Sequence, residues 1–118
     1  MKKEKRVVIT GIGPLTAGGS GKREVWDAVI NKRTGLIEKE YKIDGETLGK
    51  FFVHKIKNFD INNYGINQQI LDEIRSWKMG DEITDLYYFL AVIKMAMDDA
   101  GLKINDKNKY NTGLILAH

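Results

Sequence analysis

The first residues whose spacing suggests chemistry are glycines that follow a β-branched run near the N-terminus. Gly11 and Gly13 fit the start of a dinucleotide-binding G-x-G-x-x-G motif, but Thr16 stands where the third glycine is required. Gly21 and the lysine after it fit the end of a phosphate-binding P-loop, but Arg23 replaces the hydroxyl residue. We interpret the segment as a tight strand-to-helix connection with close backbone approach, and keep nucleotide binding as an alternative.

Candidate metal ligands and acid–base groups are few. His54 and His118 have no ligand partner at a recognised spacing, so we expect His54 to be a structural or surface residue. Asp98 and Asp99 form a carboxylate pair at the end of a predicted helix, where a solvated face is a simpler interpretation than catalysis. Ser20 lies at a predicted helix cap with no histidine near it and is interpreted as structural. The sequence predicts no complete catalytic constellation, no metal site and no cofactor.

Composition narrows the possible classes. The chain has 118 residues, enough for one domain, and it contains no cysteine, so it carries no disulfide and no cysteine nucleophile. It has 19 basic and 16 acidic residues, and the excess sits in a basic tail at 1–6, so we expect no nucleic-acid partner. No apolar run approaches the roughly 20 residues of a membrane span, and the N-terminus lacks the apolar stretch of a secretory signal. We therefore expect no membrane association and a cytoplasmic location.

The pattern of apolar residues predicts an α/β domain. Strands are expected at 6–10, 51–56 and 112–117, helices at 22–31, 67–78 and 82–100, and a loop at 36–50. The order β-α-β-α-α-β is typical of a mixed sheet with crossover helices.

Two features indicate that this domain is part of a larger assembly. The helix at 82–100 is apolar on nearly every side, with Lys94 as the one charge between Leu86 and Met97. The last predicted strand is apolar and ends at Ala117-His118, and an exposed apolar edge invites association. We expect either a truncation or an obligate partner.

Several segments together resemble one protein family. They are Arg6-Val7-Val8-Ile9-Thr10-Gly11-Ile12-Gly13, Val25-Trp26-Asp27-Ala28, Lys57-Asn58-Phe59-Asp60, Trp77-Lys78-Met79, Met97-Asp98-Asp99-Ala100-Gly101-Leu102 and Asn111-Thr112-Gly113-Leu114-Ile115. In this order, over nearly all 118 residues, the chain resembles the N-terminal region of the β-ketoacyl synthases of the 3-oxoacyl-[acyl-carrier-protein] synthase II type. The family pattern is broken around Gly80-Asp81-Glu82-Ile83-Thr84.

The resemblance implies part of a thiolase-like fold, with residues 1–118 as the N-terminal portion of a ketosynthase-like domain. In that family a cysteine thiolate accepts an acyl group, and two histidines promote decarboxylation of malonyl-carrier protein in fatty-acid or polyketide chain elongation. The resemblance places those three residues outside this chain, which is therefore expected to be inactive alone. It also implies a dimer, an acyl carrier protein as partner, and the remainder of the synthase or a partner chain.

The resemblance further implies that Arg75 and Lys78 help to dock the acidic carrier protein. Asp72 and Glu73 lie beside them, so an ordinary solvated helix face is the alternative interpretation. For the chain as a whole, the alternative to a synthase portion is a non-catalytic module that binds a carrier protein or a second synthase chain.

Overall fold

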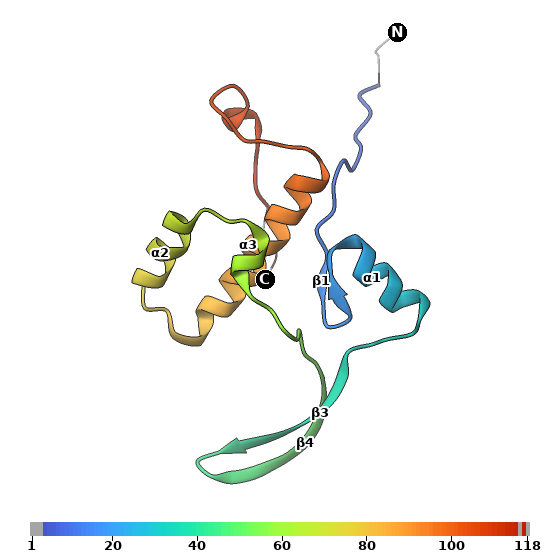
Figure 1. Ribbon diagram of the computed structural model, residues 1–118, viewed down its shortest axis with the longest axis vertical. Coiled ribbons are helices and arrows are strands. Elements are labelled where there is room, and N and C mark those ends of the chain that lie inside the picture. Colours follow the sequence, from blue (N-terminus) through green and yellow to red (C-terminus); the bar gives the residue numbers. More distant parts are fainter. Residues whose placement is uncertain (1–3, 116, 118) are drawn as a thin grey trace.

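A computed structural model describes residues 4–115 and 117 of the chain (Figure 1). The described part contains three α-helices and two antiparallel hairpins, separated by short 3-10 turns. The elements in chain order are β1 (Leu15–Thr16), β2 (Gly19–Ser20), α1 (Gly21–Ile30), β3 (Leu36–Ile43), β4 (Glu46–His54), α2 (Gln68–Ser76) and α3 (Ile83–Asp99), with 3-10 turns at Ile61–Tyr64, Gly80–Glu82 and Lys109–Asn111.

The three predicted helices are confirmed, with ends shifted by a few residues. α1, α2 and α3 correspond to the helices expected at 22–31, 67–78 and 82–100. The expected end of α3 is also present, because Gly101 has a left-handed φ of 63° and the amide of Leu102 donates to the carbonyl of Met97 at 2.8 Å. These helices form as predicted because their periodicity and caps are local signals.

A small core forms where α2 and a 3-10 turn pack on the middle of α3. Ala91 of α3 is fully buried, Leu71 of α2 is 1% exposed and Ile61 of the turn is 4% exposed. Partly buried side chains surround this cluster, among them Phe59, whose ring meets that of Tyr88 edge-on at 4.6 Å between centroids. The core therefore covers one side of α3 only.

The segment from 36 to 54 corrects the sequence prediction most strongly. A loop was expected at 36–50 and a strand at 51–56, whereas β3 and β4 form one long antiparallel hairpin. Asp44 and Gly45 make its turn, with φ of 50° and 85°, the left-handed pair that a two-residue hairpin turn requires. One register shift follows, where Leu48 is an extra residue on β4.

The other two predicted strands are not formed in the part of the chain that the structure describes. Residues 6–10 run as extended chain without a strand partner, and so do residues 112–115 and 117, while Leu116 and His118 lie outside the described residues. Val7 is 95% exposed and Ile115 is 97% exposed. A strand exists only when its backbone groups pair with a neighbour, and neither segment has one here. The sheets observed are two separate antiparallel pairs, so mixed α/β content is confirmed and a crossover sheet is not.

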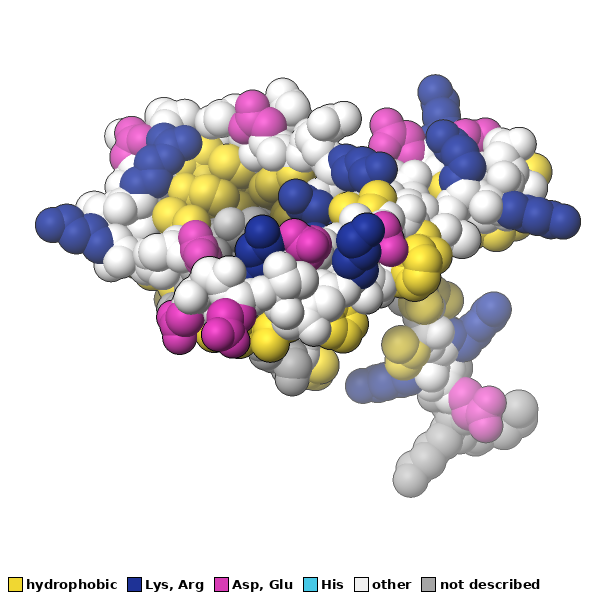
Figure 2. All heavy atoms as spheres, turned by 90° about the horizontal axis from the view of Figure 1, so that it is seen from below, with side chains coloured by type: hydrophobic (Ala, Val, Ile, Leu, Met, Phe, Trp, Pro, Cys, Tyr) yellow, Lys and Arg dark blue, Asp and Glu magenta, His cyan; other side chains and the backbone are white. Residues whose placement is uncertain are grey.

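The molecule is extended and exposes much apolar surface. Its radius of gyration is 18.4 Å, against about 13 Å for a compact domain of this length. Its accessible surface is 10306 Å², against about 6,500 Å² for a compact monomer of this mass. Figure 2 shows apolar side chains gathered in broad patches on the face seen from the hairpin end. None of the helices among the described residues is long and apolar enough to cross a membrane.

Candidate functional site

The glycines singled out in the sequence lie directly against α3. A Cβ at position 11 would come within 2.6 Å of the amide nitrogen of Ala100, and a Cβ at position 13 within 2.6 Å of that of Ala96. Real Cβ atoms do not approach backbone so closely, so both positions require glycine. The predicted close approach is confirmed, and the neighbour is a helix.

Several backbone amides of this segment have hydrogen-bond partners inside the protein. The amide of Gly18 donates to the hydroxyl of Thr16 at 3.1 Å, that of Ser20 to the Glu24 carboxylate at 2.9 Å, and that of Gly21 to a carbonyl at 2.8 Å. A phosphate cradle depends on free amides that point at the ligand. The amides of Gly18, Ser20 and Gly21 are therefore not free to bind a phosphate.

Asp99 connects the glycine segment, α1 and the end of α3. Its carboxylate accepts a hydrogen bond from the amide of Ile12 at 2.9 Å and forms an ion pair with Lys22 of α1. The hydrogen bond from Lys22, then that from the Ile12 amide, hold the pKa of Asp99 below its ordinary value of 3.8, and partial burial opposes them. Asp99 is thus an exposed residue whose carboxylate is engaged in structural contacts, whereas Asp98 pairs with Lys94 on the exposed face.

Ser20 occupies the predicted N-cap position of α1, but its side chain does not cap the helix. Its hydroxyl lies 2.8 Å from the hydroxyl of Tyr64 and 3.5 Å from the sulfur of Met95. Ser20 and Tyr64 border an open cleft of about 660 Å³, which Arg33 and Lys57 also line. Ser20 therefore joins the first hairpin to the core turn, a structural role as expected. The Ser20–Tyr64 contact joins residues 44 positions apart, and no sequence signal identified it.

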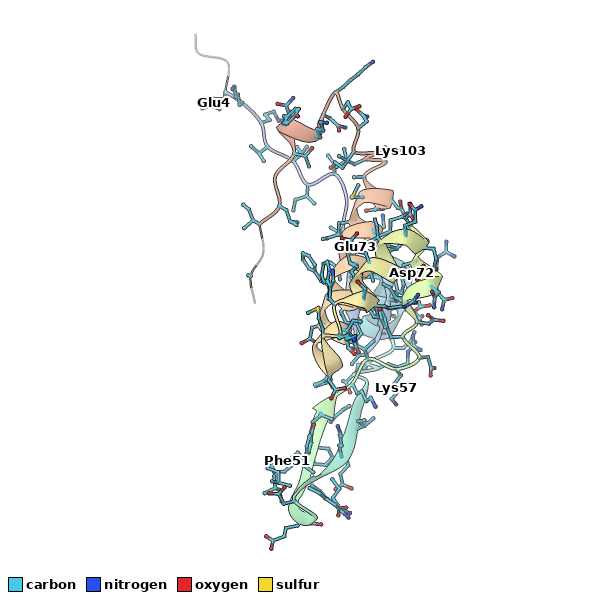
Figure 3. All side chains as sticks on the ribbon, turned by 90° about the vertical axis from the view of Figure 1, so that its left-hand side faces the viewer. Glu4, Phe51, Lys57, Asp72, Glu73 and Lys103 are labelled. Atoms are coloured by element: carbon cyan, nitrogen blue, oxygen red, sulfur yellow. The ribbon has the colours of Figure 1, made fainter. Side chains whose placement is uncertain are left out.

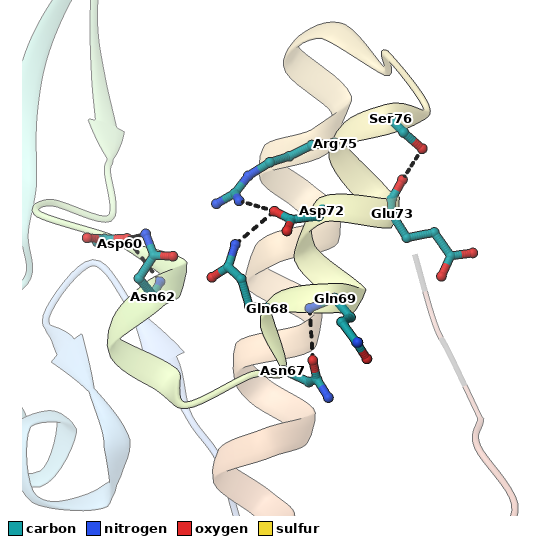
Figure 4. A network of polar contacts seen from close by, with 9 residues as sticks. All are labelled: Asp60, Asn62, Asn67, Gln68, Gln69, Asp72, Glu73, Arg75 and Ser76. Carbon is teal, nitrogen blue, oxygen red and sulfur yellow. Dashed lines mark hydrogen bonds and ion pairs between the residues drawn. The ribbon is translucent and has the colours of Figure 1, made fainter.

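The two predicted docking residues lie on and just after α2, and Figure 4 shows one of them, Arg75, beside Asp72. Arg75 donates to the carboxylate of Asp72 at 2.8 Å, and the amide of Gln68 donates to the same oxygen at 2.8 Å. Lys78 is exposed and adopts a left-handed φ of 52°. The two side chains are thus at the same end of α2, and the Arg75 charge is partly neutralised by a neighbour on its own helix.

The remaining candidates are structural or lie outside the described residues. The Nδ1 atom of His54 lies 2.8 Å from the carbonyl oxygen of Thr34, so this ring ties the end of β4 to the entry of β3. His118 lies outside the described residues. In the part of the chain that the structure describes, no three acidic, histidine or cysteine residues gather as a metal site would require.

Comparison with known proteins identifies the family. The profile of the β-ketoacyl synthase N-terminal domain matches residues 4–118. The chain belongs to the β-ketoacyl synthase family. It is 31% identical over 114 residues to 3-oxoacyl-[acyl-carrier-protein] synthase 2 of Staphylococcus aureus (strain N315). This alignment covers 97% of this chain and 25% of that protein. It is 28% identical over 115 residues to the enzyme of the same name from Vibrio harveyi, covering 96% of this chain and 25% of that protein. No solved structure matches significantly.

The chain spans about one quarter of the length of those curated relatives. The family resemblance expected from the sequence is confirmed over nearly the whole chain. The stretch 80–84, where the β-ketoacyl synthase pattern is broken, forms a 3-10 turn that leads into α3. Gly80 begins that turn with a left-handed φ of 61°.

We predict that Gly13→Ala destabilises the fold by about 1–3 kcal/mol, because the added methyl group overlaps the backbone of α3 at Val92 and Ala96. Urea unfolding followed by circular dichroism measures the effect. The matched control is Gly113→Ala, where a Cβ meets nothing within 4 Å and no loss is expected. Equal stability of the two variants would contradict the packing role of Gly13.

We predict that Asp99→Asn lowers stability at neutral pH and flattens its dependence on pH in acid. The pKa of Asp99 is lower in the folded than in the unfolded chain, so its stabilisation is present above the ordinary value of 3.8 and is lost as pH falls through the folded pKa. Melting temperatures of the wild type and variant between pH 2 and 7 test this. Asp98→Asn, which removes an exposed carboxylate, should leave the profile nearly unchanged.

Proposed function

We propose that this chain forms the N-terminal part of a β-ketoacyl-acyl-carrier-protein synthase that acts in fatty-acid or polyketide chain elongation in the cytoplasm. The observation that carries the proposal is the family match over residues 4–118. Both relatives are named 3-oxoacyl-[acyl-carrier-protein] synthase 2, which supports the same reaction class for this chain.

The reaction needs groups that this chain does not contain. Decarboxylative condensation releases carbon dioxide from malonyl-carrier protein, joins its carbanion to an acyl thioester and frees the thiol that held the acyl group. The chain has no cysteine, so the thiol must come from other protein, either the remainder of the synthase or a partner chain. The exposed apolar surface, on Val7 and Ile115 for example, supports such a contact.

In this proposal the chain contributes scaffold and a carrier-docking surface rather than reacting groups. The docking surface consists of Arg75 and Lys78 at the end of α2. A carrier carboxylate that binds Arg75 must compete with Asp72, which accepts a hydrogen bond from the same guanidinium at 2.8 Å. Removal of the Asp72 charge should therefore strengthen docking.

We predict that the double variant Arg75→Glu/Lys78→Glu weakens binding of acyl carrier protein by about tenfold or more, because an attractive charge contact becomes repulsive. Asp72→Asn should instead strengthen binding, and both effects should shrink as salt is added. Surface plasmon resonance with immobilised carrier protein measures the affinities. The matched control, Lys103→Glu/Lys107→Glu, changes the same number of exposed charges away from α2. If the control weakens binding as much as the α2 variant, the docking site is misplaced.

We predict that the chain alone produces no β-ketoacyl product from acyl- and malonyl-carrier protein. The physical reason is the missing thiol nucleophile. Mass spectrometry of the carrier-bound products measures the outcome, with an intact 3-oxoacyl-carrier-protein synthase as the positive control. Condensation by the cysteine-free chain would refute this account of the chemistry.

The alternative function is a non-catalytic module that binds a carrier protein or a second synthase chain. The observation that favours it is the well-formed hairpin β3–β4, which extends away from the helices (Figure 1). A module should remain monodisperse in solution, whereas a portion of an enzyme should aggregate through its exposed apolar segments. Light scattering on the purified chain distinguishes the two.

A further inference from the structure

The turn at the tip of the β3–β4 hairpin contains the one Asp-Gly step of the sequence, and the sequence has no Asn-Gly step. These two dipeptides rearrange their own backbone most readily, because glycine places no side chain beside the attacking amide nitrogen. Figure 3 shows Phe51 on this hairpin, which extends away from the helices. Asp44 and Gly45 are both exposed. Water therefore reaches both residues of the turn.

The Asp44 carboxylate is not engaged by the charges of its own hairpin. The ion pairs there join Lys42 to Glu40 and Lys50 to Glu38. Other aspartates accept a hydrogen bond from a neighbour, namely Asp27, Asp60, Asp72, Asp98, Asp99 and Asp106. A Cβ at position 45 would meet nothing within 4 Å, so the space beside the Gly45 amide is open. The carboxyl group and the next amide nitrogen are therefore unobstructed.

The backbone of the turn is held in a conformation that is costly for a residue with a side chain. Asp44 has a left-handed φ of 50°, which stores strain that rotation releases. The cross-strand ladder pairs Ile43 with Glu46 and leaves the Gly45 amide outside it. Leu48 interrupts the ladder nearby as an extra residue, and isolated hairpins are marginally stable in water. Asp44 can therefore rotate with little loss of pairing.

We propose that Asp44 is a modification site, at which the folded chain converts aspartate to isoaspartate without an enzyme. The Gly45 nitrogen attacks Cγ of Asp44, so that an N–Cγ bond forms, a Cγ–O bond breaks, and the amide proton leaves with the carboxyl hydroxyl as water. Water then attacks the main-chain carbonyl carbon of Asp44 in the cyclic imide and breaks its bond to nitrogen. The chain now runs through Cγ, and no oxidant or reductant is needed. The mass of the protein is unchanged.

The modification changes both the shape and the chemistry of the hairpin tip. The Cβ atom of Asp44 enters the main chain, and a two-residue turn with an added backbone atom no longer pairs Ile43 with Glu46. The former main-chain carboxyl becomes a free carboxylate on an exposed segment. A carboxyl methyltransferase that uses S-adenosylmethionine transfers a methyl group from the sulfonium to an oxygen of this carboxylate. The Gly45 nitrogen then displaces methanol from the ester and re-forms the cyclic imide, which returns part of the chain to aspartate.

Ageing of the full chain at physiological pH and temperature tests the proposal. Proteolytic peptides are separated by liquid chromatography, and electron-transfer fragmentation in a mass spectrometer distinguishes isoaspartate from aspartate. Asp106 is the internal control, because it is exposed in a turn but is followed by Lys107 and paired with Lys109. We expect isoaspartate at position 44 to accumulate at least about tenfold faster than at position 106. Equal accumulation at the two positions, or isomerisation of Asp44 in urea only, would overturn the proposal.

Two substitutions at position 44 test the ring-closing step. Asp44→Glu keeps the charge but lengthens the side chain, so it should abolish the isomer and the methyl label that a carboxyl methyltransferase adds from S-adenosylmethionine. Asp44→Asn keeps the turn preference and loses ammonia through the same cyclic imide, so isoaspartate should form faster than in the wild type. Circular dichroism checks that both variants are folded. An aged Asp44→Glu chain that is labelled as strongly as the wild type places the modification elsewhere and refutes the proposal.

Hydrogen exchange tests the structural consequence. In the isomerised chain the amide of Glu46 loses its partner across the turn and should exchange about tenfold faster or more. The amide of Leu71 is the control, because it donates to the carbonyl of Asn67 at 3.2 Å in the core and should exchange as before. Unchanged exchange at Glu46 in the isomerised chain would show that the turn tolerates the added atom, against the proposal.

Discussion

The close contact between the glycine segment and α3 is the constraint on which the rest of the fold depends. Gly11 and Gly13 let the chain run along the helix at a distance that no side chain would allow. This approach brings the amide of Ile12 to Asp99, and Asp99 in turn holds Lys22 of α1. The first hairpin and α1 are therefore positioned from α3, which also contributes Ala91 to the core.

The helices could be predicted from the sequence, whereas only residues 51–54 of the predicted strands lie in an observed strand, because helices and strands depend on different information. The spacing of apolar residues and the glycine at 101 mark α3 locally. Residues 6–10 and 112–115 have strand composition, but pairing needs a partner that local patterns do not supply. The β3–β4 hairpin differs from the loop predicted at 36–50 for another reason. Asp44-Gly45 is a typical hairpin turn, but the residues around it are mostly polar, and a polar stretch favours the prediction of a loop.

The sequence likewise predicted only part of the candidate site. Sequence resemblance identified the family and named Arg75 and Lys78, because those inferences need only residue order. It did not reveal that Arg75 and Gln68 donate to the same carboxylate oxygen of Asp72, or that Asp99 differs from Asp98 in its partners. Whether a charged side chain is free or engaged depends on its neighbours in space, and those neighbours become visible only when the helix faces are known.

The large native surface has a thermodynamic consequence. An unfolded chain of this mass exposes about 19,000 Å², so a native surface of 10306 Å² means that folding hides only about half of it. Heat-capacity change and denaturant sensitivity both scale with the surface exposed on unfolding. The unfolding of this chain on its own is therefore shallow in urea and broad in temperature. A contact that covers α3 and the extended segments makes both the urea and the thermal unfolding transitions steeper. The steepness of unfolding therefore reports whether these surfaces are covered.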